Sequence, residues 1–238
     1  MPVAVTPSGS THALLLEEER GRGEGILALG DPDYAGATAG AQPALHRGRP
    51  LAALPGTRGE VKAIATAGAL LGAKASEAGL REALGARKRW RAVHLACHGL
   101  VDGERPFQSS LAVTRAGDDD GFLTAQEVLS MKIPSDLAAL SACETATGEV
   151  VGGEGIVGLT RAFMYAGTPR VICSLWKVDD EATRALMVKF HELWNPKDGK
   201  PGLPTAEALR QAQEFVRSQE KWKHPYFWAA WVLWGLPS

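Results

Sequence analysis

From residue 25 onward, short apolar segments alternate with longer stretches of helical pattern, and this alternation constrains the fold more than any other feature of the chain. Strands are expected at residues 26–29, 92–96, 111–113, 137–141, 170–175 and 229–233. Helices are expected at residues 58–71, 77–84, 124–131, 156–165, 179–193 and 205–217. Strands separated by helices are joined by crossover connections, so the sequence predicts an α/β fold with a mostly parallel sheet.

The first residues lack this regular pattern. Residues 1–24 contain a Ser-Gly-Ser segment and the charged run 17–20, which predict a loose N-terminal arm or the remnant of a longer protein. Residues 25–238 are expected to form one domain, because the chain is long enough to bury a substantial core. Residues 35–56 are rich in Gly, Ala and Pro and are expected to be a long loop.

Composition argues against several classes of protein. The formal net charge is −1, which provides no global field for nucleic acid or an anionic membrane. The apolar run at 227–236 is too short to span a bilayer, and no signal peptide is evident. The three cysteines Cys97, Cys143 and Cys173 cannot all pair with one another, which favours a reducing, cytoplasmic setting.

Two of the expected strands lead into chemically reactive residues, His98 and Cys143. The carboxyl ends of parallel strands meet at one edge of a sheet, so both side chains are expected there. A thiolate needs a nearby base or cation at neutral pH, and imidazole commonly supplies it. The backbone N–H groups of Gly99 and Cys143 are candidates to stabilise an oxyanion. Taken singly, either side chain is more often structural; the pair favours cysteine peptidase chemistry.

Several segments in the same order closely resemble the CHAT family of caspase-like peptidase domains, which are mostly bacterial and often fused to TPR repeats. The matching segments are residues 29–33, 94–99, 140–145, 155–167, 174–180 and 226–229. The resemblance covers roughly residues 26–236 and implies a caspase-like three-layer α/β/α sandwich. It places the family's histidine on His98 and its cysteine on Cys143.

The resemblance also implies a biological context. It suggests a regulated endopeptidase in bacterial defence or cell death, with a protein substrate and a TPR-type or upstream activating partner. Family members commonly begin with a further strand and an aliphatic-proline segment, which is weak or missing here. A catalytically silent module that binds a partner peptide remains the alternative, although Cys143 and His98 are both present.

Residues 175–180 are similar to the corresponding segment of separases, which cleave after arginine. An acidic side chain at the base of a pocket would select a basic residue through a charge-assisted pair, and Asp180, then Asp179, is the candidate. An Asp at this position is equally suited to cap the following helix, so both interpretations stay open. The backbone of Ser174 to Trp176 is a candidate to pair with an extended peptide, and Trp176 to wall a subsite or to lie in the core.

Other motifs carry less weight. Residues 153–158 match G-x-G-x-x-G but do not directly follow a strand, so nucleotide binding there is a minor hypothesis. His94 and His98 are separated by about 13 Å along a strand, too far apart to share one metal ion. His94, Cys97 and Cys173 are expected in the core, and no metal or cofactor is expected.

Overall fold

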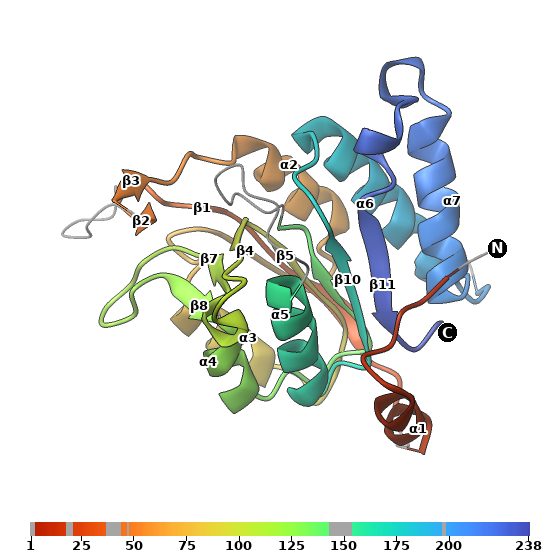
Figure 1. Cartoon of the computed structure of the whole chain (residues 1–238), viewed down its shortest axis with the longest axis horizontal. Helices are drawn as coiled ribbons and strands as arrows, with labels where there is room; N and C mark the ends of the chain where they lie inside the picture. The colour runs from red at the N-terminus through yellow and green to blue at the C-terminus, as the bar shows by residue number, and fades with distance from the viewer. Residues whose placement is uncertain (1–2, 18–20, 37–43, 47, 143–153, 197–198) are drawn as a thin grey trace.

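A six-stranded sheet with the order β11–β10–β9–β5–β1–β4 forms the centre of the computed structural model (Figure 1). The model describes residues 3–17, 21–36, 44–46, 48–142, 154–196 and 199–238. The strands are β1 (Glu24–Pro32), β4 (Gly68–Gly72), β5 (Trp90–Ala96), β9 (Ala138–Leu140), β10 (Arg170–Ser174) and β11 (Trp231–Gly235). Strand β11 is antiparallel to β10, and the other neighbouring pairs are parallel, which confirms the predicted α/β fold.

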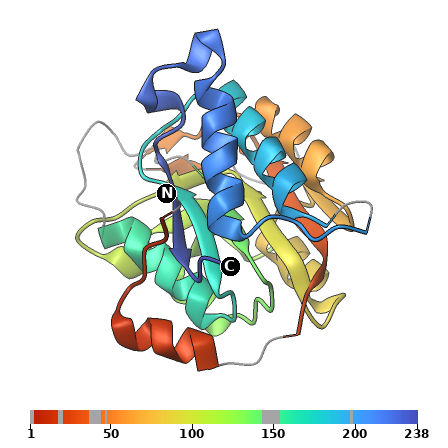
Figure 2. The ribbon, with the colours of Figure 1, turned by 90° about the vertical axis from the view of Figure 1, so that its right-hand side faces the viewer.

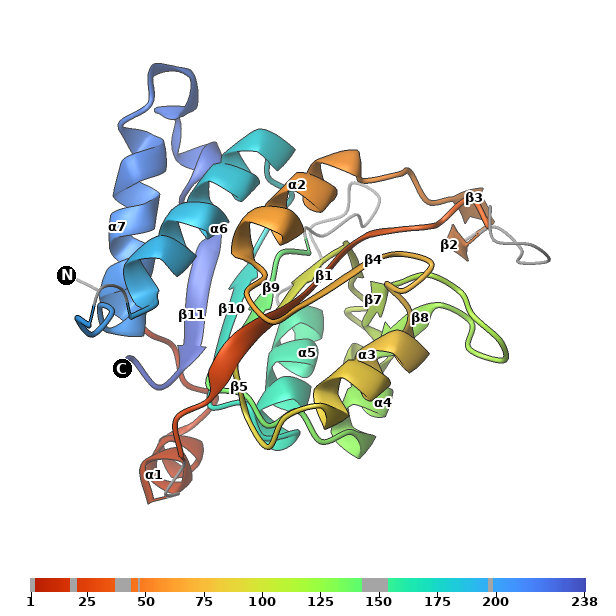
Figure 3. The same cartoon turned by 180° about the vertical axis from the view of Figure 1, so that it is seen from behind.

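Helices cover both faces of this sheet, so the molecule has three layers (Figures 2 and 3). One face carries α2 (Pro55–Ile64), α6 (Asp180–Trp194) and α7 (Thr205–Arg217), and the other carries α3 (Glu77–Gly85), α4 (Ala125–Ser130) and α5 (Glu154–Tyr165). Side chains alternate between the two faces along each strand. On β5, Val93 and Leu95 pack in the α3–α5 layer, while Ala92 packs in the α6–α7 layer.

A second, antiparallel sheet extends from the carboxyl end of β5. It consists of β6 (His98–Leu100), β7 (Ser110–Ala112) and β8 (Phe122–Thr124), in that order. The main sheet strand β5 ends at Ala96, so His98 begins the small sheet rather than ending the large one. The remaining short elements are β2 (Leu45–His46), β3 (Arg49–Pro50), η1 (Pro106–Gln108), η2 (Glu220–Trp222) and η3 (Pro225–Phe227).

Helix starts follow local capping chemistry. Thr124 caps α4, at the start of the helix expected at 124–131, with a complete capping box in which its hydroxyl accepts from Glu127 N–H and the Glu127 carboxylate accepts from Thr124 N–H. Thr205, where the helix expected at 205–217 begins, is not the capping residue. Pro204 occupies that position, and the Thr205 hydroxyl instead accepts a 3.0 Å hydrogen bond from the indole of Trp194.

The expected helix at 58–71 is also wrong in its second half. Helix α2 ends at Ile64, and residues 68–72 form the edge strand β4, paired in parallel with β1. Near the N-terminus, the segment expected to be loose contains helix α1 (Gly9–Glu17). Before it, Val5 forms a parallel bridge with Trp234 and so extends the sheet beyond β11.

Candidate active site

The candidate base, His98, stands just beyond the carboxyl end of β5, beside the end of β9. Its backbone N–H donates to the hydroxyl of Tyr34 at 3.1 Å, and that hydroxyl donates to the carbonyl of Ala112 at 2.9 Å. The two rings also contact each other, with centroids 5.2 Å apart. Tyr34 therefore fixes the position of His98 through both its hydroxyl and its ring.

The His98 imidazole is oriented by a backbone carbonyl. Nε2 lies 2.8 Å from the carbonyl oxygen of Ala52, which can only accept, so Nε2 donates. In the neutral ring this tautomer leaves Nδ1 as the nitrogen that accepts a proton. A backbone oxygen thus occupies the orienting position for which the sequence offers no clear side chain.

Burial lowers the pKa of His98 below its ordinary value, because the charged ring loses hydration there. The hydrogen bond to the Ala52 carbonyl opposes this change by stabilising the protonated ring. Lys177 lowers the pKa further, and Asp180 raises it. The imidazole is therefore neutral at neutral pH, which is the state that a general base requires.

Gly99 brings the small sheet against the end of β9. A Cβ at Gly99 would lie 3.1 Å from the carbonyl oxygen of Ala142 and 3.3 Å from the Ala142 side chain. Glycine at this position permits the close approach of the two backbones. Ala142 is the last described residue before Cys143, and Cys143 itself lies outside the described residues.

A cavity of about 230 Å³ opens beside the His98 ring. It lies between the segment that leads into α2, the ends of β5 and β9, and the start of α6. Its lining is Ala52, Ala53, Leu54, Gly56, Thr57, Glu60, Cys97, His98, Ser141, Lys177, Val178, Asp180 and Thr183. The structure thus brings the predicted base and the predicted specificity residue Asp180 to one cavity.

The cavity wall contains a second acid, which the sequence does not single out. Glu60 is 2% exposed, and its Oε1 lies 2.8 Å from Nε2 of His94. His94 Nδ1 lies 3.4 Å from Nε2 of His191, which is also buried. His94 is therefore a hydrogen-bonded interior histidine, as predicted, and its hydrogen bond positions the Glu60 carboxylate in the cavity wall.

Two buried hydroxyls in the same wall have unused hydrogen-bonding capacity. Ser141 and Thr183 are each 5% exposed, and neither hydroxyl oxygen has a partner among the described residues. A buried polar group without a partner is destabilising unless a ligand or water satisfies it. Together with Glu60 and Asp180, these hydroxyls make the cavity suitable for a polar or cationic group.

The other predicted binding residues do not appear among the described residues that line this cavity. Asp179 caps α6, with its carboxylate accepting from Ala182 N–H at 3.0 Å. The Trp176 indole packs with the α6–α7 layer and donates to the carbonyl of Tyr226 at 3.1 Å. Ser174 pairs with Trp231 in the sheet, and Leu175 N–H donates to the carbonyl of Ala230. On the side that faces β11, this backbone therefore pairs with the protein's own chain.

The two described cysteines lie away from solvent. Cys97 and Cys173 are buried, and burial raises the pKa of both thiols to about 12, with a hydrogen bond to Trp234 opposing this at Cys173. Both lie in the core, as predicted. Because a raised pKa disfavours the thiolate at neutral pH, neither residue suits the role of nucleophile.

Among the described residues there is no cluster of three or more His, Cys, Asp or Glu side chains placed to hold a metal ion. The same part of the chain contains no helix with the length and apolarity needed to cross a bilayer.

Some site residues give no signal in the sequence. Ala52 contributes only a backbone carbonyl. Glu60 resembles a solvent-facing charge in an amphipathic segment, although it is buried. Tyr34 directly follows segment 29–33, which resembles the CHAT family, and this position is the one sequence signal for it.

A family model described as CHAT domain matches residues 2–236. Tetratricopeptide repeat protein 28 of Homo sapiens is 34% identical over 114 residues, which cover 48% of this chain and 4% of that protein. The Mus musculus protein of the same name matches to the same extent. The chain thus spans a small part of the curated relatives it matches.

Solved structures with this fold include two families of protein. The Saccharomyces cerevisiae separase–securin complex matches with a TM-score of 0.60 and 16% identity, over 100% of this chain and 14% of that one. The Arg-specific cysteine proteinase gingipain R matches with a TM-score of 0.53 and 10% identity, over 96% of this chain and 51% of that one. These similarities show a common caspase-like fold.

Proposed function

The chain belongs to the CHAT-domain family, and from that premise we propose that it is a cysteine endopeptidase with Cys143 as nucleophile and His98 as base. The observation that carries the proposal is the cavity beside His98, which is bordered by Ser141 and Asp180. It puts an oriented, neutral imidazole next to a polar pocket, and Ser141 in the wall of that pocket lies two residues before the proposed nucleophile in the sequence.

The proposed reaction proceeds through an acyl-enzyme. The Cys143 thiol gives its proton to His98 Nδ1, and Sγ attacks the carbonyl carbon of the scissile peptide, while the Gly99 and Cys143 N–H groups stabilise the oxyanion. The C–N bond breaks as protonated His98 gives its Nδ1 proton to the departing amine. A water molecule then attacks the thioester and gives a proton to His98. The C–S bond breaks, the acid product leaves, and His98 returns the proton to the Cys143 sulfur.

The cavity supports a preference for arginine or lysine before the scissile bond. Asp180 and Glu60 supply negative charge, and the Ser141 and Thr183 hydroxyls supply further acceptors. A guanidinium group has five N–H donors in a planar fork, which this number of acceptors suits. Lys177 also lines the cavity, and its positive charge weakens the attraction for a basic side chain. Reversing the charge of Asp180 or Glu60 would therefore test the preference for arginine or lysine.

We extend the proposal to biological context. The family match and the tetratricopeptide relatives support a TPR-associated setting with a regulatory partner. Ser174 to Trp176 remain candidates to pair with an extended peptide and to wall a subsite, and Asp179 remains the second candidate for the acidic residue of the pocket. A role in bacterial defence or cell death and a cytoplasmic location complete the proposal.

A peptide library with every residue at the P1 position tests this function. Wild type is expected to cleave after Arg or Lys, and the Cys143→Ala variant is expected to cleave none of the peptides. Cleavage that persists in the variant would contradict the assigned nucleophile. Binding of a P1-Arg peptide without cleavage, measured with the cognate partner present, would instead support the silent interaction module.

A further inference from the structure

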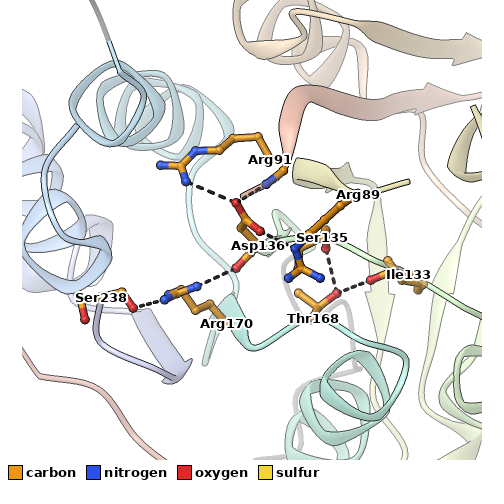
Figure 4. Close-up of polar contacts among 9 residues, drawn as sticks. Arg89, Arg91, Ile133, Ser135, Asp136, Thr168, Arg170 and Ser238 are labelled. Carbon is orange, nitrogen blue, oxygen red and sulfur yellow. Dashed lines mark hydrogen bonds and ion pairs between the residues drawn. The ribbon is translucent and has the colours of Figure 1, made fainter. Parts of the chain in front are cut away.

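The amino ends of the parallel strands carry an arginine cluster that lies at the opposite edge from His98. Arg22 precedes β1, Arg89 and Arg91 stand at the start of β5, and Arg170 begins β10. Asp136 precedes β9 and contacts Arg89, Arg91 and Arg170 (Figure 4). Four arginines that are separated in sequence therefore reach one edge of the sheet.

These side chains surround a cavity of about 310 Å³. Its lining is Leu15, Leu16, Gly21, Arg22, Arg89, Arg91, Asp136, Pro169, Arg170 and Leu236. Among these described residues Asp136 is the one acid, and residues 18–20 lie outside the description. Among the described lining residues, four guanidinium groups thus share one side-chain carboxylate, and Arg170 also donates to an oxygen of Ser238 (Figure 4).

The Asp136 carboxylate is fully engaged. Arg89 Nε lies 2.6 Å from its Oδ1, while Arg91 Nη1 lies 3.4 Å from Oδ2. Oδ2 also accepts the backbone N–H of Gly23 at 2.9 Å. Arg170 reaches the Asp136 backbone carbonyl rather than the carboxylate. The Asp136 carboxylate therefore contacts two of the four guanidinium groups.

The guanidinium of Arg91 is held rigidly and is not fully used. It stacks on the Trp194 ring at 3.8 Å and donates to the Trp194 carbonyl at 3.2 Å. Its side chain is only 14% exposed, yet Nε has no hydrogen-bond partner among the described residues. Arg22 is close enough to oppose its charge electrostatically. A buried donor without a partner and an excess of arginines over acids among the described lining residues both favour an anion in this cavity.

We propose that this arginine cluster binds a phosphate group carried by a small ligand. A phosphate bears nearly two negative charges at neutral pH and offers several acceptor oxygens. Guanidinium groups match these oxygens with paired, charge-assisted hydrogen bonds. The cavity is larger than a phosphate ion, so a phosphate attached to a larger molecule also fits.

Calorimetric titration of the full chain with inorganic phosphate, at ionic strength matched with chloride, tests the proposal. We expect saturable binding and a rise in Tm that chloride does not reproduce. Titration with ADP distinguishes the source: tighter binding than phosphate identifies a nucleotide-like ligand, and equal binding identifies the phosphate group alone.

Two variants separate a site from a general charge effect. Arg22→Gln removes an exposed member of the cluster and is expected to weaken phosphate binding about tenfold, with unchanged circular dichroism. Arg217→Gln makes the same change in charge on α7, outside this cavity, and is expected to leave the affinity unchanged. Equal weakening in both variants, or no phosphate binding above the chloride control, would overturn the proposal.

Discussion

The two edges of the central sheet differ in how completely their polar groups are satisfied. At the carboxyl edge, His98 is held by a phenol and a backbone carbonyl, while the hydroxyls of Ser141 and Thr183 lack partners among the described residues. At the amino edge, two arginines engage Asp136, and the described residues that line the cavity include more arginines than acids. The comparison indicates that changes at the carboxyl edge alter reaction and specificity, whereas changes at the amino edge alter stability and anion binding.

The largest expected effect is on the reaction. Replacing His98 with Ala removes the proposed base, and we expect kcat/KM to fall about 10³-fold because positioned acid–base groups contribute on this scale. The Tm is expected to change little, so the loss of activity would not come from unfolding. Arg217→Gln serves as a control with unchanged activity. A His98→Ala enzyme that retains most of its activity would break the assignment of function to the carboxyl edge.

The second effect concerns stability at the amino edge. Asp136→Ala leaves Arg89 and Arg91 without their carboxylate, and we expect the free energy of unfolding to fall by about 3 kcal/mol. Chemical denaturation measures this change. Peptidase kcat/KM, measured well below the melting temperature, is expected to stay within about twofold of wild type. A large loss of activity in the folded variant would show that the two edges are coupled.

Adjacent aspartates provide a matched test of specificity. Asp180→Ala is expected to reduce kcat/KM for P1-Arg peptides about tenfold, through loss of a charged partner, while P1-Leu peptides change little. Asp179→Ala is expected to lower stability by about 1 kcal/mol, through loss of the α6 cap, without a change in P1 preference. The reverse result would assign the pocket to Asp179.

The smallest expected effect is on the pH dependence of stability. Burial, then His94 and Arg91, lower the pKa of His191 well below its ordinary value. Below about pH 6.5, His191 therefore binds a proton in the unfolded chain but not in the folded chain, and the free energy of unfolding falls as the pH drops. His191→Phe is expected to reduce this slope in denaturation curves at pH 5 to 7. An unchanged slope would assign the dependence to other groups.

Much of the fold follows from local sequence. The strands expected at 26–29, 92–96 and 170–175 lie within or overlap β1, β5 and β10, because continuous apolar runs are typical of a sheet covered on both faces. Strand β4 was missed, since alanine-rich residues 63–69 favour a helix locally and only pairing with β1, distant in sequence, makes this segment extended.

The candidate site was predicted unevenly for a similar reason. His98 and Asp180 carry distinctive side chains at the ends of elements, and the structure places both at one cavity. The Ala52 carbonyl and the buried Glu60 depend on tertiary contacts that leave no local pattern. The aspartates were ambiguous because helix capping and charge recognition use the same side chain, and geometry separates them.

The reactivity of the three cysteines tests the central claim most directly. The intact protein would be treated with iodoacetamide at pH 7.5, and alkylation at each cysteine followed by peptide mass spectrometry. The account predicts rapid modification of Cys143, with Cys97 and Cys173 protected by burial and by their raised pKa of about 12. It also predicts that the His98→Ala variant slows modification of Cys143. Modification of Cys97 or Cys173 before Cys143, in the folded protein, would contradict the account.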